Sequence, residues 1–148
     1  NLLNSSAGCV VSDAFPETDY GNVIDACAEQ RMGVFAIRVY AGGAIVGQPP
    51  APHTFKTKFF PLDLFQRDTE RAAQLADLLD TGASLADAGL RYVLGHPQIQ
   101  AAIVGFSSPS QVQQAVDSLL AGPLSERLYG QLASAGRNPP AADESLSR

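Results

Sequence analysis

The sequence predicts an α/β protein in which parallel strands alternate with helices. Residues 34–40 and 100–106 are β-rich and apolar on both faces, as expected for strands buried on both sides of a parallel sheet. A helical pattern precedes the first of these stretches and another follows the second, which is the order found in β-α-β units. With a further strand end at "NLLN" (1–4), the pattern gives three parallel strands. It is a slice of a doubly wound sheet or of a β/α barrel.

The helices are predicted from apolar residues at helical spacing and from local start and stop signals. Ser84 and Asp87 have the spacing of a capping box, and Pro97 prevents that helix from continuing. Gly33 and Gly82 are placed to end two of the others. The predicted helices are 21–30, 67–82, 84–97, 109–122 and 125–134.

Two segments are predicted to lack regular structure. The connection 41–65 is rich in Gly and Pro, and a connection of this length covers a binding site or is partly disordered. Its four phenylalanines are expected to pack the loop down, the alternative being an apolar pocket: Phe55, Phe59, Phe60 and Phe65. Residues 1–135 form the folded part, and 136–148 are predicted to be a disordered tail.

Composition limits the partners and the compartment. A net charge of −5 and a pI near 4.8 argue against a nucleic-acid surface, and no apolar run approaches membrane-spanning length. Cys9 and Cys27 have no metal-like spacing, so two free thiols in a reducing cytoplasm are favoured over a disulfide. The chain opens at Asn1 without an initiator methionine, and we expect it to be a piece of a longer protein.

The turn after the second predicted strand contains the residues of a helix N-cap. Ser108 stands at a helix N-cap, Pro109 at the first helical position, and Gln111 three residues after the cap. Such a capping box needs no ligand. It also leaves backbone N–H groups at the positive end of a helix dipole, beside the carboxyl end of a parallel strand. This is where α/β proteins bind anions, so phosphate binding is the functional alternative.

Three linked segments carry a resemblance to a known family. They are "GVFAIRVYAGGAIVG" (33–47), "SLADAGLRYVLGHPQIQAAIVGFSSPSQVQQAV" (84–116) and "GPLSERLYGQL" (122–132). Together they resemble the C-terminal part of an aldo-keto reductase, and "NLLN" looks like the family's sixth barrel strand. The resemblance implies a (β/α)8 TIM barrel of which this chain carries strands six, seven and eight, in residues 1–135.

The resemblance also implies two cofactor-binding segments. The first lies along the pyrophosphate and matches Arg38, Val39, Tyr40 and Gly42. The second wraps the adenosine phosphate and adenine end and matches Gly105, Phe106, Ser107, Ser108, Gln111 and Gln114. Family members often have Ser-Pro-Leu where this chain has residues 38–40. Arg38 therefore either supplies positive charge to the pyrophosphate or forms an ion pair at the barrel mouth.

The cofactor is expected to be NADP or NAD. Members that favour NADP often carry a lysine or arginine in the second segment, which neutralises the 2′-phosphate. This chain has Gly105, Ser107, Ser108 and Gln111 there. Ala115 also stands where an adenine-contacting asparagine is common. NAD is therefore at least as plausible as NADP.

The implied reaction is hydride transfer between the nicotinamide and an aldehyde, ketone or sugar. The tyrosine, lysine, aspartate and histidine that serve it lie on earlier strands, so no catalytic residue is assigned here. His53 and His96 are expected in solvent-exposed or helix-terminal roles, and the tyrosines lack the lysine pairing that catalysis needs. No P-loop or GxGxxG motif occurs.

The alternative function is a non-catalytic nucleotide-binding or assembly module derived from a truncated barrel. Three strands alone leave open sheet edges and expose the side chains that would face the barrel interior. The chain is therefore expected to need the remainder of the barrel, or a second copy of itself, to cover them.

Overall fold

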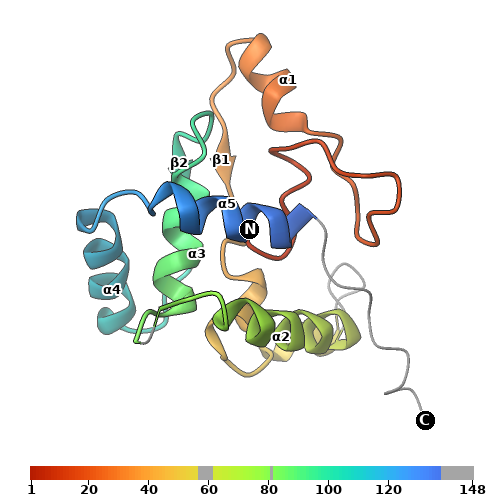
Figure 1. Ribbon diagram of the computed structural model, residues 1–148. Helices are drawn as coiled ribbons and strands as arrows, with labels where there is room; N and C mark the ends of the chain where they lie inside the picture. The colour runs from red at the N-terminus through yellow and green to blue at the C-terminus, as the bar shows by residue number, and fades with distance from the viewer. Residues whose placement is uncertain (57–61, 81, 138–148) are drawn as a thin grey trace.

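The computed structural model describes residues 1–56, 62–80 and 82–137. Its two strands form a parallel pair that, with the first helix, extends as an arm from a mainly helical body (Figure 1). Two α-helices lie before the second strand in the body, and two follow that strand. The elements in chain order are α1 (Val23–Glu29), β1 (Phe35–Ala36), the 3-10 helices η1 (Ala41–Val46) and η2 (Pro52–Phe55), α2 (Leu62–Ala76), α3 (Leu85–Leu94), β2 (Ala101–Ala102), α4 (Pro109–Leu120) and α5 (Glu126–Arg137).

The parallel pairing is confirmed, but both strands are shorter than the sequence predicts. Phe35 pairs with Ala101 and Ala36 with Ala102. The expected strand at 1–4 does not form: Leu2 and Leu3 lie in a turn. The Asn1 side-chain oxygen accepts hydrogen bonds from the backbone N–H groups of Leu3 and Asn4, at 3.0 and 3.1 Å. This local bonding replaces a strand ladder.

The expectation that both strand faces are buried is wrong for one face. Phe35 and Ile37 each expose 65% of their surface, and Ile103 exposes 56%. Ala36 and Ala102, which alternate with them, pack against the core. Within the described residues, no other element covers the face that carries Phe35, Ile37 and Ile103. The described chain therefore leaves these three side chains exposed on this face.

The connection after β1 contains more helix than the sequence predicts. η1 and η2 fall within 41–65, and α2 begins at Leu62 and ends at Ala76, where 67–82 was expected. Beyond Ala76 the N–H groups of Leu78 and Leu79 bond three residues back, so the chain leaves the helix through tighter turns. Among the loop's phenylalanines, Phe65 is buried as expected of packing, whereas Phe55 is 62% exposed. Phe59 and Phe60 lie outside the described residues.

Both predicted helix caps are confirmed. The Ser84 hydroxyl accepts a hydrogen bond from the N–H of Asp87 at 3.0 Å, and α3 begins at Leu85. The Ser108 hydroxyl does the same for Gln111, and Pro109 opens α4. Removing such a cap costs about 1 kcal/mol. These local bonds fix the turns that precede α3 and α4.

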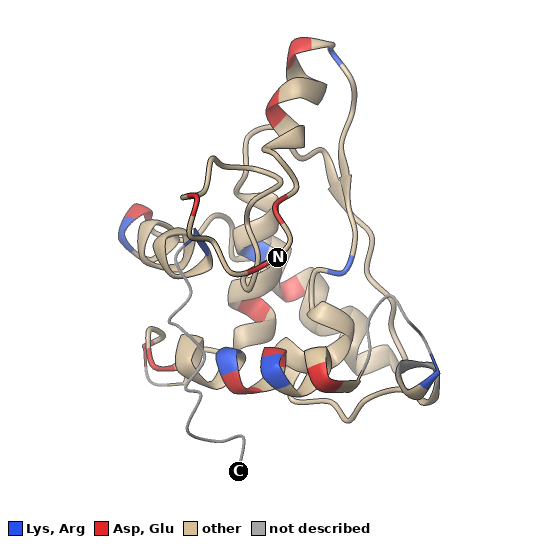
Figure 2. Ribbon diagram, turned by 90° about the vertical axis from the view of Figure 1, so that its right-hand side faces the viewer, with Lys and Arg blue, Asp and Glu red and all other residues tan. Residues whose placement is uncertain are grey.

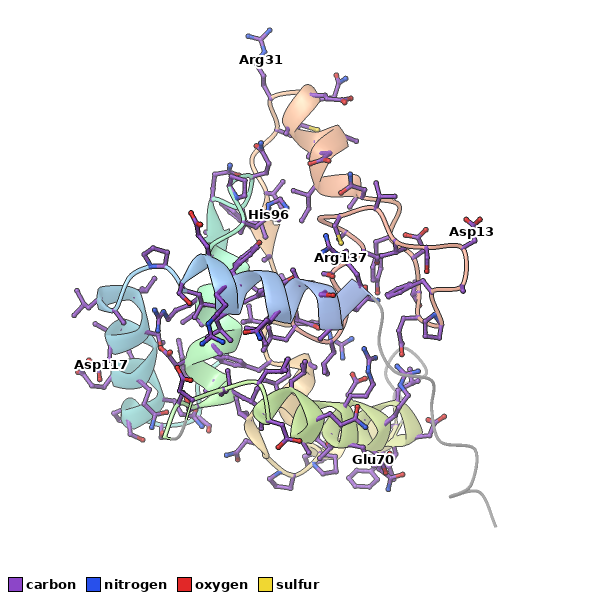
Figure 3. The ribbon with its side chains drawn as sticks, viewed as in Figure 1. Asp13, Arg31, Glu70, His96, Asp117 and Arg137 are labelled. Atoms are coloured by element: carbon purple, nitrogen blue, oxygen red, sulfur yellow. The ribbon has the colours of Figure 1, made fainter. Side chains whose placement is uncertain are left out.

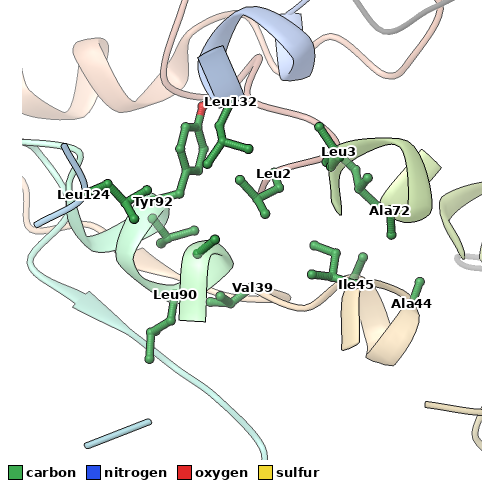
Figure 4. Close-up of a cluster of buried hydrophobic side chains, with 14 of the residues drawn as sticks. Leu2, Leu3, Val39, Ala44, Ile45, Ala72, Leu90, Tyr92, Leu124 and Leu132 are labelled. Atoms are coloured by element: carbon green, nitrogen blue, oxygen red, sulfur yellow. The ribbon is translucent and has the colours of Figure 1, made fainter. Parts of the chain in front are cut away.

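The core lies between α2, α3, α5, η1 and the first residues of the chain (Figure 4). Leu2 and Leu132 are both fully buried, although Leu2 is not in a strand. α5 continues to Arg137, beyond the predicted end at 134, and residues 138–148 of the expected tail lie outside the described part. The largest contributors to the core are Leu2, Leu3, Val39, Ile45, Phe65, Leu75, Leu90, Tyr92, Val93, Leu124 and Leu132.

Candidate cofactor-binding site

The first candidate segment is the turn that leaves β1. The Arg38 carbonyl accepts hydrogen bonds from the Asn1 side-chain amide at 3.2 Å and from the Ala41 N–H at 3.0 Å. The Tyr40 carbonyl accepts from the Gly43 N–H at 2.9 Å and so tightens the turn. The chain therefore reverses within a few residues of the strand end.

This turn holds an unusual run of left-handed backbone. Arg38 has φ 55° and Ala41 φ 49°, and both carry a Cβ that disfavours this region. Gly42 and Gly43 follow with φ 69° and 107°, where glycine meets no such penalty. Strained residues of this kind collect at binding sites, and mixed-hand turns expose consecutive N–H groups that suit anions.

The side chains of this segment differ in accessibility. Arg38 is exposed and Tyr40 is half-buried, but Val39 is buried in the core and offers only its backbone. Burial raises the pKa of the Tyr40 phenol, and the nearby Asp87 carboxylate adds to the increase. Tyr40 is therefore a neutral hydrogen-bonding group at ordinary pH.

The second candidate segment is the turn between β2 and α4. The Gln111 side-chain oxygen accepts hydrogen bonds from the Ser107 N–H at 2.7 Å and from the Ser107 hydroxyl at 3.1 Å. The Ser108 and Ser110 hydroxyls lie 2.9 Å apart. In the expected capping box the Gln111 side chain would accept from the N–H of Ser108. In the structure it accepts from the N–H and hydroxyl of Ser107, one residue earlier.

An open hollow adjoins this second turn. It is lined by Phe106, Ser107, Ser108, Pro109, Val112 and Gln113. A Cβ placed on Gly105 would meet nothing within 4 Å, so the chain before the hollow is unobstructed. Gln114 is exposed but is not one of the residues that line the hollow. The structure thus brings the predicted residues 106–108 together around one surface depression.

The two segments share one end of the strand pair, because β1 and β2 are parallel and each turn follows its strand. They differ in charge. Arg38 belongs to the first, whereas the sequence from 92 to 126 contains no lysine or arginine. Hydroxyls, amides and backbone N–H groups are what the second segment offers to a ligand.

The histidines and lysines do not form a catalytic cluster in the described residues. His96 follows α3, as predicted, and its Nε2 donates to the Gly8 carbonyl at 3.0 Å (Figure 3). Its Nδ1 accepts from the Gln98 N–H at 3.2 Å, which fixes the neutral tautomer. The side chain of His53 lies outside the described part. His96 therefore ties the loop before α1 to the end of α3.

Tyr92 and Tyr129 pack against each other, whereas a catalytic tyrosine would pair with a lysine. The rings of Tyr92 and Tyr129 are stacked with centroids 5.0 Å apart. Burial raises the pKa of the Tyr92 phenol to about 12, although a hydrogen bond with Ser5 acts in the opposite direction. The pair is a structural contact between α3 and α5.

Because the pKa of the Tyr92 phenol is raised in the folded state, we expect the protein to lose stability at alkaline pH. This folded pKa of about 12 exceeds the ordinary tyrosine value of 10.0, so the unfolded chain loses this proton first as the pH rises. The contribution is complete below pH 10 and is lost between about pH 10 and 12. We expect urea unfolding to show this decline, and Tyr92→Phe to reduce it. An unchanged pH dependence in Tyr92→Phe, with Tyr20→Phe as the exposed control, would contradict the assignment.

A buried charge network was not predicted from the sequence. Arg67 and Arg71 on α2 both contact Glu17, at 2.6 and 2.7 Å, and Arg71 also donates to the Leu3 carbonyl at 2.6 Å. Acidic and basic residues lie close together along α2 (Figure 2). Spacing of four residues places the two arginines on one helix face, but nothing in the sequence indicates Glu17 as their partner.

Two further classes of site are absent from the part of the chain that the structure describes. No group of three or more His, Cys, Asp or Glu residues there can hold a metal ion. No helix within the same ranges is long and apolar enough to span a membrane. Cys9 and Cys27 are both free thiols, as predicted.

Parallel strands with helices after each strand, and two turns at one strand end, define the chain as part of an α/β fold with a candidate anion-binding edge. The sequence model of the Aldo/keto reductase family matches residues 10–137. The chain therefore belongs to the aldo/keto reductase family, and the resemblance is confirmed at the level of the family. That family implies a (β/α)8 barrel, and the two parallel strands and their helices are a small part of such a fold.

Solved structures show the same likeness of fold. Aldo-keto reductase AKR11C1 from Bacillus halodurans in its holo form matches with a TM-score of 0.56 and 20% sequence identity, covering 83% of this chain. Its apo form matches with a TM-score of 0.54 and 20% identity, covering 81%. The chain spans only 40% and 39% of these two structures. A comparison with curated proteins found no match.

Proposed function

We propose that the chain is the cofactor-binding C-terminal portion of an NAD(P)-dependent oxidoreductase that acts on an aldehyde, ketone or sugar. It would carry barrel strands six to eight, with "NLLN" taking the place of strand six when the barrel is complete. The observation that carries the proposal is the pair of turns at one end of the parallel strands. Each begins within a few residues of its strand end, where α/β proteins bind ligands.

The residues of the first turn suit the pyrophosphate. Arg38 carries a positive charge at an exposed position beside the left-handed backbone through Gly42, although the N–H groups of Ala41 and Gly43 already bond within the turn. Tyr40 adds a neutral hydroxyl. Val39, being buried, would contribute only its main chain.

The residues of the second turn suit the adenosine end. Ser107 and Ser108 offer hydroxyls at the N-terminus of α4, Gly105 leaves room for close approach, and the exposed ring of Phe106 borders the hollow. Gln111 is already oriented by Ser107, with its amide nitrogen left available. Gln114, outside the hollow, would act only at the adenine edge. These groups fit a ribose hydroxyl as well as a phosphate. Charge therefore does not favour one cofactor over the other, and we propose NAD or NADP.

The chemistry would need the rest of a barrel. The nicotinamide supplies the hydride when it is bound, and the chain's own residues would hold and orient the dinucleotide. No tyrosine in the described residues has a lysine partner. A non-catalytic nucleotide-binding module remains the alternative, and nucleotide binding without turnover in a completed barrel would favour it. We also propose a cytoplasmic location, supported by the two free thiols.

A leucine in place of Gly105 is expected to weaken nucleotide binding at least about tenfold. The φ of Gly105 is not in the left-handed region, and a Cβ there meets nothing within 4 Å, so the substitution leaves folding intact and fills the approach to Ser107. Calorimetric titration of NAD and of NADP into the 148-residue chain measures the effect.

The matched control is Gly130→Leu. Gly130 is exposed on α5 and also has open space around its Cβ, but it lies outside both candidate turns. Binding by the control with the affinity of the unmodified chain supports the location. Failure of both the unmodified chain and a completed barrel that contains it to bind either nucleotide, or equal binding by Gly105→Leu, would overturn the cofactor proposal.

A further inference from the structure

Asn1 connects the start of the chain to the first candidate turn. Its side-chain oxygen accepts hydrogen bonds from the N–H groups of Leu3 and Asn4, at 3.0 and 3.1 Å. Its side-chain nitrogen donates to the Arg38 carbonyl at 3.2 Å, a bond between residues 37 positions apart in the sequence. One amide group therefore closes the turn at 1–4 and also holds the turn that leaves β1.

The backbone at Arg38 needs a contact of this kind, because a residue with a Cβ disfavours the left-handed region that Arg38 occupies, with φ 55°. The N–H of Ala41 also bonds the Arg38 carbonyl, at 3.0 Å. That bond leaves the φ of Arg38 free, since the type of a turn is set by its two central residues and Arg38 stands at the first position. β1 fixes the chain before Arg38, and the bond from Asn1 fixes the carbonyl after it. Together they constrain the dihedral angles between.

Both ends of the Asn1 link are attached to the core. Leu2, next to Asn1, is fully buried, and Val39, next to Arg38, is 2% exposed. The peptide group between Arg38 and Val39 is thus held by a hydrogen bond on one side and by a buried side chain on the other. The Arg38 side chain itself is exposed, and the backbone dihedral angles at that residue limit the directions in which its guanidinium can extend.

We propose that Asn1 is a positioning residue for the cofactor pyrophosphate, because it holds the left-handed conformation of Arg38 and so directs the Arg38 guanidinium toward the phosphate groups. The inference rests on the proposed function in one respect, that the turn at 38–42 meets the pyrophosphate. Asn1 acts through Arg38 and needs no contact with the cofactor. A ligand that spans both candidate turns therefore depends on Asn1, whereas a mononucleotide held by the turn at 105–111 does not.

The variant Asn1→Asp removes the bond to Arg38 and keeps the other two. An aspartate oxygen still accepts from the N–H groups of Leu3 and Asn4, but an ionised carboxylate has no hydrogen to donate to the Arg38 carbonyl. The turn at 1–4 therefore stays closed while its link to the first candidate turn is lost.

The matched control is Asn4→Asp. The Asn4 side-chain oxygen accepts from the Ser6 N–H at 3.0 Å, and its nitrogen donates to the Thr18 carbonyl at 2.9 Å. The control thus makes the same chemical change, the loss of one donor and the gain of one negative charge, but the lost donor does not serve the first candidate turn. Because the added charge in Asn1→Asp lies beside Arg38, the titrations are repeated near 1 M salt, where the Debye length is about 3 Å.

Two measurements separate the positioning role from the proposed function. Hydrogen exchange over residues 38–43 of the 148-residue chain, without nucleotide, reports on the conformation of the turn. Calorimetric titration of a completed barrel that contains the chain, with AMP and with ADP-ribose, reports on binding. ADP-ribose carries the pyrophosphate, whereas AMP ends at the first phosphate. Thermal unfolding verifies that both variants fold.

We expect Asn1→Asp to speed exchange over 38–43 and to weaken ADP-ribose binding about tenfold at both salt concentrations, with AMP affinity changed less than about twofold. Asn4→Asp should leave all three quantities as they are in the unmodified protein. Unchanged exchange in Asn1→Asp, equal weakening of AMP and ADP-ribose, or loss of the effect at high salt would overturn the positioning role even though the unmodified protein binds nucleotide. Binding of neither ligand by the unmodified protein would instead contradict the proposed function, and this role of Asn1 with it.

Discussion

Substitution of Glu17 by alanine is expected to lower the free energy of unfolding by about 3 kcal/mol. The Glu17 carboxylate is 10% exposed and bonds two guanidinium groups, Arg67 at 2.6 Å and Arg71 at 2.7 Å. Its removal leaves two arginines close together with one remaining acidic neighbour. Arg71 is 12% exposed, so water cannot replace the lost partner. Arg67 is about one-third exposed, and for that reason we take the lower end of the range for broken buried pairs.

Asp68 is a poor substitute for Glu17. Burial raises the pKa of its carboxyl, and the two arginines only partly oppose this. Its contact with Arg67, at 3.4 Å, is also longer than the bonds of Glu17. The loss of Glu17 therefore leaves an uncompensated positive charge against α2, and the loop of residues 9–20 loses its attachment to that helix.

Urea unfolding of Glu17→Ala and Asp80→Ala provides the comparison. Asp80 pairs with Arg127 at 4.0 Å, and both side chains are largely exposed, so we expect its removal to change stability by less than about 0.5 kcal/mol. Equal unfolding midpoints for the two variants would show that the Glu17 network does not stabilise the fold.

Helix starts could be predicted from the sequence because their causes lie within four residues. Ser84 with Asp87, and Ser108 with Gln111, form hydrogen bonds that residue type and spacing already imply. The turn candidates at 38–42 and 105–111 follow from the same kind of local pattern. The parallel pairing of β1 and β2 also follows, because helical segments separate the two strands along the chain.

Features that depend on distant residues could not be predicted in this way. Glu17 meets Arg67 across 50 residues, and no periodicity connects them. The apolar pattern of 34–40 and 100–106 indicates two buried faces, but burial depends on neighbours, and the described chain supplies neighbours on one face only. The turn at "NLLN" is an exception with a local cause, because the Asn1 side chain bonds the N–H groups of Leu3 and Asn4, while Leu2 remains buried as a strand residue would be.

Substitution of Leu132 by alanine is expected to have the other large effect, a loss of about 3 kcal/mol of stability. Leu132 is fully buried, and it holds α5 against the core beside Leu2 and Tyr92 (Figure 4). The contact has little room to relax, because α5 approaches the first residues closely. A Cβ on Gly136 would come within 2.8 Å of the Leu2 carbonyl oxygen. The cavity left by alanine therefore remains largely open.

Leu120→Ala is the matched control for Leu132→Ala, since it removes the same atoms from a helix position that is 80% exposed. We expect the control to change the free energy of unfolding by less than about 0.5 kcal/mol. Thermal and urea unfolding of both variants measure the difference. If the two substitutions lowered the free energy of unfolding by the same small amount, α5 would not be part of the folded core. Because Leu132 of α5 is buried beside Leu2, its loss should also free the first residues of the chain, detectable as faster hydrogen exchange at Leu3 and Asn4.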